Sequence, residues 1–304
     1  METVVVLGAD KDLGQSVVHA LLQDGSFTVR AAVQDTGSPL AQQLQQAGSQ
    51  IVAVNFKSAS GLQEALKGAQ KCFASTTTDF TDIDALKNEI HQGYLIADAC
   101  KQHGLKHVVF QGGHHVHRRY GFPARHMDAK ACVNDYMNEI SLPKTELILP
   151  FLYESFLTTF KPKPAGPNFY KLDIPAGETP LDAISVKHVG LIASVLLKNS
   201  HKWIGKSCPL SAERLTVDQY AATLNEHLQP RQFKDSRISV RMFVENYNGA
   251  GGEDLGNMFE FWKKGAQKTN VALTHTLCPE TQRFSQWVSE NKDLIINRLE
   301  QHPL

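Results

Sequence analysis

The sequence lacks several features that would each point to a particular class of protein. No apolar run reaches the roughly 18 residues that a membrane span needs. The 31 lysines and arginines balance 31 aspartates and glutamates, so no net charge favours nucleic acid or an anionic membrane. The five cysteines form no C-x-x-C pair, which argues against a disulfide framework. We therefore expect neither direct nucleic-acid binding nor membrane association.

A secretory leader is not expected either, because an apolar strand pattern begins within the first few residues. An odd number of scattered cysteines is typical of a reducing compartment. The sequence therefore predicts a cytoplasmic protein, with perinuclear and nuclear locations as open alternatives.

Two catalytic signatures are absent as well. None of the seven tyrosines has a lysine four residues later, the pair in which an ammonium lowers the pKa of a proton-donating phenol. No G-x-S-x-G turn supports a hydrolase. The nearest analogue is His126, which shares one helix face with Lys130. His126 is thus the only catalytic candidate, and a packed histidine beside a ribose-binding or surface lysine is the alternative interpretation.

Three histidines gather in a segment that the sequence predicts as a loop, residues 112–119. His114, His115 and His117 lie too close together along the chain to share a tetrahedral metal site easily. No cysteine or carboxylate is near them in sequence, so we expect no metal.

The first 22 residues carry the most informative pattern. An apolar run, residues 4–7, ends at Gly8, a second glycine follows at Gly14, and residues 15–22 have helical spacing. This is the strand, turn and helix of a dinucleotide-binding unit, with the helix N-terminus available to a pyrophosphate. Lys11 stands where a third glycine would complete G-x-x-G-x-x-G. If that position requires a positive φ, Lys11 is strained by about 1–2 kcal/mol.

Further strands and helices alternate along the chain. Apolar strand patterns at 27–33, 51–54, 71–77, 106–110 and 145–150 are separated by helical patterns at 40–47, 61–66, 83–103 and 124–139. This alternation predicts an α/β Rossmann fold with a doubly wound parallel sheet. We expect residues 1–150 to form this domain, with returning segments around 182–228. Residues 151–181 and 229–304 are expected to form a smaller, interleaved C-terminal α+β lobe.

Taken together, these segments resemble the NmrA-like proteins, an atypical branch of the short-chain dehydrogenase superfamily. The resemblance covers nearly the full length and rests on residues 4–14, 21–30, 126–130, 149–155 and 254–259. It implies a Rossmann fold with a small C-terminal lobe and NADP(H) binding without demonstrable catalysis. It also implies a redox-responsive regulator that changes protein partner or oligomeric state, with a homodimer expected.

The resemblance also implies a set of cofactor contacts. It places the phosphate loop first, then the end of the second strand, the adenine site, the ribose–nicotinamide stretch and the nicotinamide end. In that order the residues are Gly8, Ala9, Asp10, Lys11, Asp12, Leu13 and Gly14; Gln34, Asp35 and Ser38; Asn55 and Phe56; Thr76, Thr77, Thr78 and Lys130; and Leu152, Tyr153, Glu154 and Ser155.

Two departures leave the cofactor open. Gln34 replaces the family's arginine for the 2′-phosphate, and Asp35 beside it would repel a phosphate but could hold a ribose diol. The alternative interpretation of Asp35 is a solvated turn residue within 34–39. The resemblance implies NADP(H), whereas Asp35 favours NAD(H). If the pocket is degenerate, we expect no cofactor.

Three functions follow from these alternatives. The first is a non-enzymatic sensor that acts through a metabolic enzyme or a transcriptional regulator. The second is an NAD(P)H-dependent reductase of a small carbonyl or enone. The third is a nucleotide-free interaction scaffold.

Overall fold

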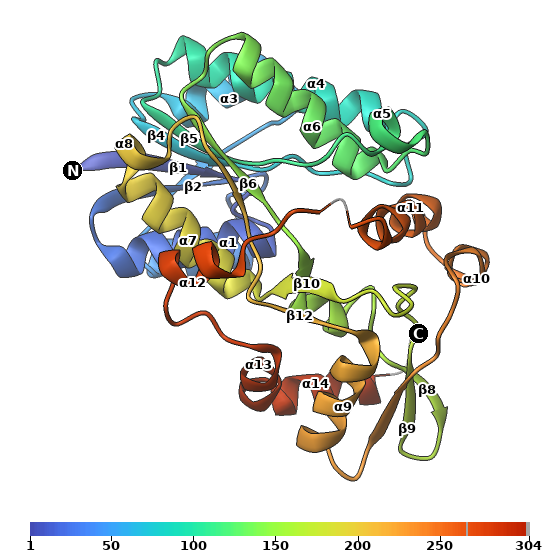
Figure 1. The fold of residues 1–304 in the computed structure, drawn as a ribbon. Coiled ribbons are helices and arrows are strands. Elements are labelled where there is room, and N and C mark those ends of the chain that lie inside the picture. Colours follow the sequence, from blue (N-terminus) through green and yellow to red (C-terminus); the bar gives the residue numbers. More distant parts are fainter. Residues whose placement is uncertain (266, 302–304) are drawn as a thin grey trace. The chain divides into compact units, whose positions relative to one another are not determined.

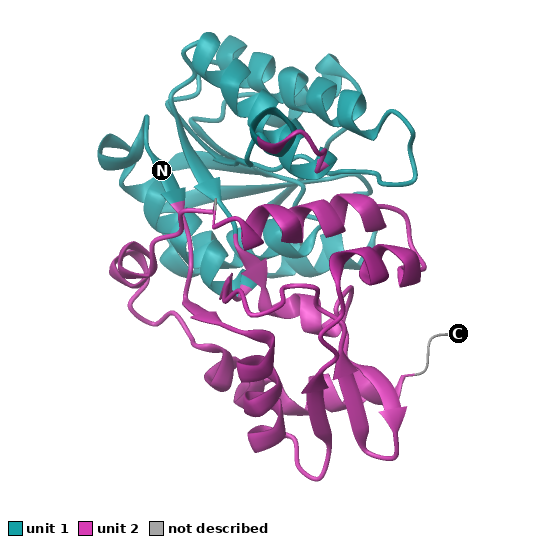
Figure 2. Cartoon of the chain, turned by 45° about the vertical axis from the view of Figure 1, so that its right-hand side comes forward, with its two compact units in different colours: residues 1–119, 125–149, 186–208 teal, residues 120–124, 150–185, 209–304 magenta. Residues whose placement is uncertain are grey.

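The computed structural model describes residues 1–265 and 267–301, and residues 266 and 302–304 of the expected C-terminal lobe lie outside the described residues. The chain divides into two compact units (Figure 2). Unit 1 contains residues 1–119, 125–149 and 186–208, and unit 2 contains residues 120–124, 150–185 and 209–304. The chain passes between the units several times, so the units are interleaved in sequence.

Unit 1 is built on a seven-stranded sheet of order β11-β6-β5-β4-β1-β2-β3 (Figure 1). Strands β1 to β6 pair in parallel. The order reverses between β1 and β4, the position at which Rossmann sheets bind their ligands. The strands are β1 (Glu2–Leu7), β2 (Phe27–Val33), β3 (Gln50–Ala53), β4 (Lys71–Ala74), β5 (His107–Gln111), β6 (Lys144–Ile148) and β11 (Ser207–Pro209). The predicted fold class is therefore confirmed.

Helices cover both faces of this sheet, which is why most residues of its central strands are apolar. α1 packs against α7 on one face, and α4 packs against α3 and α6 on the other (Figure 1). The helices are α1 (Asp12–Asp24), α2 (Pro39–Gln46), α3 (Ala59–Leu66), α4 (Ala85–Gln102), α5 (Val116–Tyr120), α6 (Arg125–Glu139), α7 (Val186–Lys198) and α8 (Ser200–Trp203).

Unit 2 contains two small sheets, of order β12-β10-β7 and β13-β9-β8, and several short helices. Its core is aromatic: Phe284 lies within ring-contact distance of Tyr153, Phe156 and Tyr220, and Phe156 also contacts Tyr220. The elements are β7 (Phe151–Leu152), the 3-10 helix η1 (Tyr153–Leu157), β8 (Lys163–Gly166), β9 (Phe169–Leu172), β10 (Leu181–Ile184), β12 (Glu213–Leu215), α9 (Val217–His227), β13 (Gln232–Asp235), α10 (Val240–Asn246), α11 (Gly252–Lys263), α12 (Val271–Leu277), α13 (Phe284–Glu290) and α14 (Lys292–Glu300).

Three details differ from the sequence prediction. The segment that returns to unit 1 is residues 186–208, shorter than 182–228, because β12 pairs with β10 and α9 packs against β13 inside unit 2. The segment 112–119, predicted as a loop, contains the start of helix α5. The fourth strand ends at Ala74 because the polar residues after it turn toward side chains of α4.

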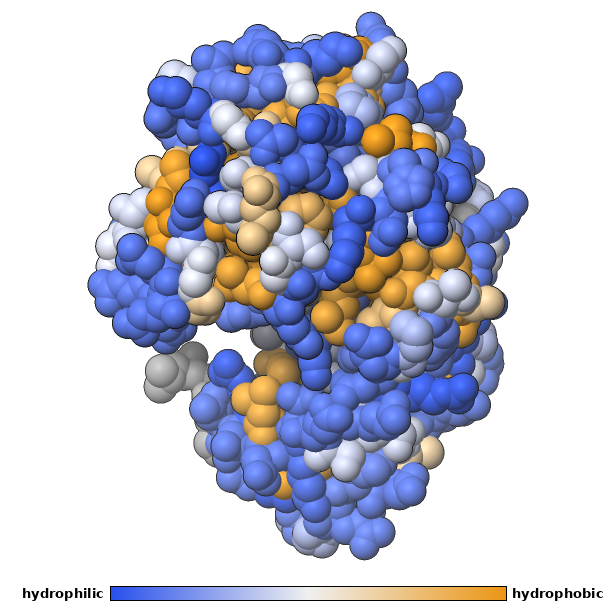
Figure 3. Space-filling view, turned by 90° about the vertical axis from the view of Figure 1, so that its left-hand side faces the viewer, coloured by the Kyte–Doolittle hydropathy of each residue, from blue (hydrophilic) through white to orange (hydrophobic). Residues whose placement is uncertain are grey.

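No helix in the described part of the chain is both long and apolar enough to cross a bilayer. Hydrophilic residues cover most of the face seen in Figure 3, with hydrophobic residues in separate patches among them.

A buried histidine makes the stability of unit 1 depend on pH. His107, in β5, is fully buried, and its Nε2 lies 2.8 Å from the Thr145 hydroxyl. That hydroxyl donates its own proton to the Trp203 carbonyl at 2.7 Å, so His107 must be the donor through Nε2. Its Nδ1 has no hydrogen-bond partner among the described residues, and protonation there would bury an unpaired charge. Burial, with a smaller effect of the Lys71 charge, lowers the pKa of His107 to about 4.

We therefore expect the free energy of unfolding to fall as the pH drops from 6.5 to 4. In that interval the unfolded chain binds a proton that the folded protein excludes, which costs about 3 kcal/mol. Urea unfolding at several pH values will measure the slope, and His107→Gln should flatten it. The exposed His19 supplies the control, since His19→Gln should leave the slope as in the wild type. An unchanged slope in the His107→Gln protein would contradict this account.

Candidate nucleotide site

The glycine loop after β1 has a compact shape that only glycine permits at two positions. Gly8 adopts a φ of 76°, and the Lys11 amide donates to the Gly8 carbonyl at 3.0 Å to close the turn. A Cβ atom on Gly14 would lie 2.1 Å from the Gly8 carbonyl oxygen, far inside any allowed contact. The start of α1 therefore lies directly against the loop, as the two glycines predict.

Lys11 does not have the strained backbone that a positive φ would have imposed. Its φ is −111° and its ψ is 154°, an extended conformation that any residue adopts. It is the N-cap of α1, its side chain is exposed, and its carbonyl accepts from the Gln15 amide at 2.8 Å. A glycine at position 11 is therefore not required by this loop, and the condition for strain at Lys11 does not hold.

The loop and the ends of neighbouring strands enclose a small cavity of about 30 Å³. Its position, at the carboxyl ends of β1 and β4 where the strand order reverses, is the position expected for a nucleotide. It is lined by Leu7, Gly8, Asp10, Lys11, Leu13, Gly14, Gln34, Phe56, Ser75 and Thr77. This volume holds one water molecule, so side chains such as Gln34 would have to move for a dinucleotide to enter.

Eight of the predicted contacts thus meet at one cavity, and the other predicted residues of unit 1 lie outside its lining. The first group is Gly8, Asp10, Lys11, Leu13, Gly14, Gln34, Phe56 and Thr77. The second group is Ala9, Asp12, Asp35, Ser38, Asn55, Thr76, Thr78 and Lys130.

Two aspartates close to the cavity have different surroundings. Asp10 accepts a hydrogen bond from Gln34 Nε2 on its Oδ2 at 3.3 Å, whereas its Oδ1 is buried and has no hydrogen-bond partner among the described residues. Asp35 has its Oδ1 occupied by the Gly37 amide at 2.9 Å, and its carbonyl accepts from Ser38 Oγ. Asp35 and Ser38 therefore build the turn into α2, and this fits the alternative interpretation of Asp35 as a turn residue.

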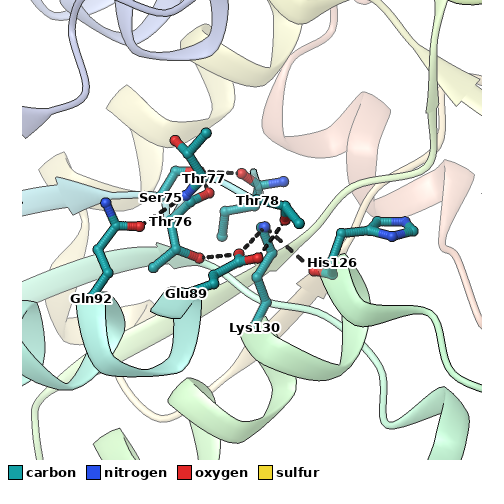
Figure 4. A network of polar contacts seen from close by, with 9 residues as sticks. Ser75, Thr76, Thr77, Thr78, Glu89, Gln92, His126 and Lys130 are labelled. Atoms are coloured by element: carbon teal, nitrogen blue, oxygen red, sulfur yellow. Dashed lines mark hydrogen bonds and ion pairs between the residues drawn. The ribbon is translucent and has the colours of Figure 1, made fainter. Parts of the chain in front are cut away.

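A buried carboxylate organises the residues that follow β4 (Figure 4). Glu89, in α4, accepts from the Thr76 hydroxyl at 2.7 Å on Oε1 and from the Thr78 hydroxyl on Oε2. The Lys130 ammonium lies 2.5 Å from Glu89 Oε1. Glu89 is 2% exposed and Lys130 is 9% exposed, so the ion pair is buried. Three predicted cofactor residues thus converge on an acid that the sequence interpretation missed.

Glu89 had a detectable signal in the sequence. It shares a helix face with Gly93, Ile96, Ala97 and Cys100, which are all buried. The helical pattern predicted at 83–103 also includes Ile83 and Leu86, and both are exposed. Gln92 and Gln111 were missed as well: the first accepts from the Thr77 amide at 3.0 Å and the second from the Ser75 hydroxyl.

His126 lies near Lys130 only through its backbone. Its carbonyl accepts from the Lys130 ammonium at 3.4 Å, while its ring packs edge-on against Phe80 with centroids 5.6 Å apart. Figure 4 shows the imidazole pointing away from the ammonium. A proton relay between the two side chains is not formed in this arrangement.

The three clustered histidines have separate surroundings. His115 Nε2 lies 2.8 Å from Asp135 Oδ2, and the backbone amide of His117 donates to Asp128 at 3.0 Å. Burial, reinforced by nearby positive charge, lowers the pKa of His114 to about 4, so it is neutral at pH 7. Across residues 1–265 and 267–301, no group of three or more His, Cys, Asp or Glu residues is placed to hold a metal ion.

The predicted nicotinamide-end residues Leu152, Tyr153, Glu154 and Ser155 belong to unit 2, in β7 and η1. The Tyr153 hydroxyl donates to Glu213 at 2.8 Å, and the Ser185 hydroxyl donates to Glu154 at 2.7 Å. Burial, followed by the nearby Glu213 charge, raises the pKa of Tyr153 far above its ordinary value. The Tyr153 phenol is therefore a structural hydrogen-bond donor of the unit 2 core.

A parallel sheet with this strand order and a glycine loop after its first strand is a Rossmann-fold architecture. The sequence model of the NmrA-like family matches residues 1–287, and the chain belongs to this family. The predicted family is thus confirmed.

Relatives and solved structures agree with this assignment. An NmrA-like family domain-containing protein of Dictyostelium discoideum is 22% identical over 273 residues, covering 83% of this chain and 89% of that protein. An NmrA-like family domain-containing oxidoreductase of Aspergillus japonicus is 29% identical over 164 residues, 52% of this chain and 49% of that protein, so the match spans about half of that relative.

The crystal structure of NmrA, a negative transcriptional regulator in complex with NADP, superposes with a TM-score of 0.81 at 19% identity. It covers 99% of this chain and 98% of NmrA, and NmrA has also been solved in complex with NAD. At this identity the likeness shows the fold.

Proposed function

We propose that this protein is a nicotinamide-dinucleotide-responsive regulator that acts through protein partners and has no reductase activity of its own. The observation that carries the proposal is the combination of a compact Gly8–Gly14 loop with a Lys130 ammonium held by Glu89. The loop supports nucleotide binding, and the ion pair argues against catalysis.

The residues present fit the phosphate-binding part of a dinucleotide. The missing Cβ of Gly14 keeps α1 close to the Gly8 turn, so backbone N–H groups at the start of α1 are available to a pyrophosphate. Asp10 and Asp12 place negative charge at the same helix start and oppose a phosphate, while Lys11 offers one exposed positive charge there. The family's usual ligand, NADP(H), and NAD(H) are both candidates for this loop.

A reductase needs more than the hydride that a bound nicotinamide supplies. It needs a group that gives a proton to the substrate oxygen. The Lys130 ammonium contacts Glu89 and the His126 carbonyl, and neither contact brings a phenol to it. The Tyr153 phenol is committed to Glu213. A ligand that binds without turning over suits a sensor whose occupancy follows the cellular level of the dinucleotide.

The output of such a sensor would be a change of partner or of oligomeric state. We propose a homodimer that engages a metabolic enzyme or a transcriptional regulator, in the cytoplasm or the nucleus. The description of NmrA as a negative transcriptional regulator supports the second partner class, although it is a property of NmrA.

We expect purified protein to bind at least one of NADPH, NADP⁺, NADH and NAD⁺ with a micromolar Kd in calorimetric titrations. Sedimentation with and without that ligand should show a shift in oligomeric state. Small carbonyl and enone compounds should not cause oxidation of NADPH or NADH. Failure of all four dinucleotides to bind would leave a nucleotide-free scaffold, and turnover would contradict the regulator.

The second candidate is a reductase, which is favoured by the oxidoreductase named among the relatives. It requires that Lys130 leave Glu89 to contact a bound nucleotide. In that case substrate-dependent oxidation of NADPH would be lost in Lys130→Met and reduced in His126→Gln. Turnover unaffected by both changes would remove these two residues from the mechanism.

A further inference from the structure

We infer that Asp10 makes the site selective for dinucleotides whose adenosine ribose has a free 2′-hydroxyl, so that NAD(H) binds more tightly than NADP(H). The inference rests on the proposed function, because it concerns the same cavity. In Rossmann proteins, the residue that distinguishes NAD(H) from NADP(H) usually follows the second strand. Here we assign this role to a residue of the glycine loop.

The first observation behind this inference is the position of Asp10 relative to β2. In a Rossmann sheet the adenosine ribose lies at the carboxyl end of the second strand. Here β2 ends at Val33, and the next residue, Gln34, donates through Nε2 to Asp10 Oδ2 at 3.3 Å. Asp10 and Gln34 also line the same cavity. The Asp10 carboxylate therefore lies beside the position that the ribose would take.

The second observation is that one carboxylate oxygen of Asp10 lacks a hydrogen-bond partner among the described residues. Asp10 Oδ1 is buried without a hydrogen-bond partner among the described residues, which is unfavourable for a carboxylate. A ribose 2′-hydroxyl can donate to that oxygen and satisfy it. A 2′-phosphate carries between one and two negative charges at pH 7 and would be repelled at this distance.

The cations near the cavity do not reverse this preference. Lys11 is the only cation among the lining residues, and it stands between Asp10 and Asp12. The guanidinium of Arg30, also in β2, donates to the carbonyls of Ala65 and Lys67 at 3.0 and 2.8 Å. Gln34 is neutral and already points to Asp10. A 2′-phosphate would therefore meet no arginine at the end of β2.

The sequence position of Asp35 suggests it as the acid that binds the ribose, but Asp35 makes other hydrogen bonds. Its Oδ1 accepts from the Gly37 amide, and Asp35 does not line the cavity. The two neighbouring acids thus offer a matched comparison, because each substitution to asparagine removes one negative charge from the same region. Only the change at Asp10 alters the group that faces the ribose.

The test compares the Kd of NADH with that of NADPH, measured by titration calorimetry on the full chain. The wild type should prefer NADH by at least about tenfold, the ratio that 1.4 kcal/mol produces. Asp10→Asn should reduce this preference to less than about threefold, mainly through tighter NADPH binding. Asp35→Asn should leave the ratio of the two constants as it is in the wild type.

A second measurement needs no variant. Wild-type protein should bind 5′-AMP more tightly than 2′,5′-ADP, since the two differ only in the 2′-phosphate. A wild-type preference for NADPH and 2′,5′-ADP, or an equal effect of Asp35→Asn and Asp10→Asn, would overturn the inference while leaving the nucleotide-binding regulator intact. Absence of binding by every one of these ligands would overturn both.

Discussion

Replacing Glu89 with alanine is expected to lower the free energy of unfolding by about 3–5 kcal/mol, since it removes the partner of a buried charge. Lys130 is only 9% exposed, and its ammonium has Glu89 as its anionic partner at 2.5 Å. The hydroxyls of Thr76 and Thr78 would lose their acceptor at the same time. The cost is therefore that of an unpaired cation together with two hydrogen bonds.

The ion pair itself need not stabilise the fold, because taking both charges out of water costs about as much as their attraction returns. The double variant Glu89→Leu/Lys130→Met should therefore be much more stable than Glu89→Ala. Hydrogen exchange in α4 and α6 will measure the loss within unit 1, and urea unfolding will measure it for the whole chain. The exposed Glu64 provides a control, as Glu64→Ala should change stability by less than about 0.5 kcal/mol. A double variant as unstable as Glu89→Ala would show that the buried charge is not the cause.

The fold could be predicted from the sequence because its signals are local. The first and fifth strands are near-continuous apolar runs, and glycines such as Gly25 end the helices between strands at positive φ. The helix predicted at 83–103 starts too early, because Ile83 is 92% exposed and α4 begins at Ala85. The buried face of α4 contains Gly93, which packs on Val133, and Glu89, which pairs with Lys130. Both partners lie in α6, far from α4 in sequence. The periodicity of α4 alone therefore does not identify them.

The candidate site was only partly predictable from the sequence, because only some of its features have local signals. Gly8 and Gly14 follow from chain geometry, so their pattern predicts the loop. The backbone conformation of Lys11 depends on the turn closed by its own amide, and the spacing of glycines does not specify it. The exchange of roles between Asp10 and Asp35 depends on hydrogen bonds to Gln34 and Gly37, which a sequence position alone does not reveal.

Replacing Gly14 with alanine is expected to abolish dinucleotide binding and to destabilise unit 1 by about 1–3 kcal/mol. The added Cβ would lie 2.1 Å from the Gly8 carbonyl oxygen and 2.9 Å from the Ala9 Cα, both backbone atoms that cannot rotate away. Relief requires α1 to move off the loop. The backbone N–H groups at the helix start would then no longer face the position of the pyrophosphate. Calorimetric titration with the dinucleotide that the wild type binds, together with urea unfolding, measures both effects.

A substitution of similar severity away from the loop separates loss of the site from loss of stability. A Cβ on Gly93 would lie 2.1 Å from Val133 Cγ2, so Gly93→Ala crowds the packing of α4 on α6 and leaves the glycine loop unchanged. Gly93→Ala should therefore lose a comparable amount of stability and keep its affinity for the nucleotide. Equal loss of affinity in both variants would mean that binding reports the general stability of unit 1. Full affinity in a folded Gly14→Ala protein would mean that the nucleotide does not rest on the Gly8–Gly14 loop, because no other packing of α1 would bring its first amides to the phosphates.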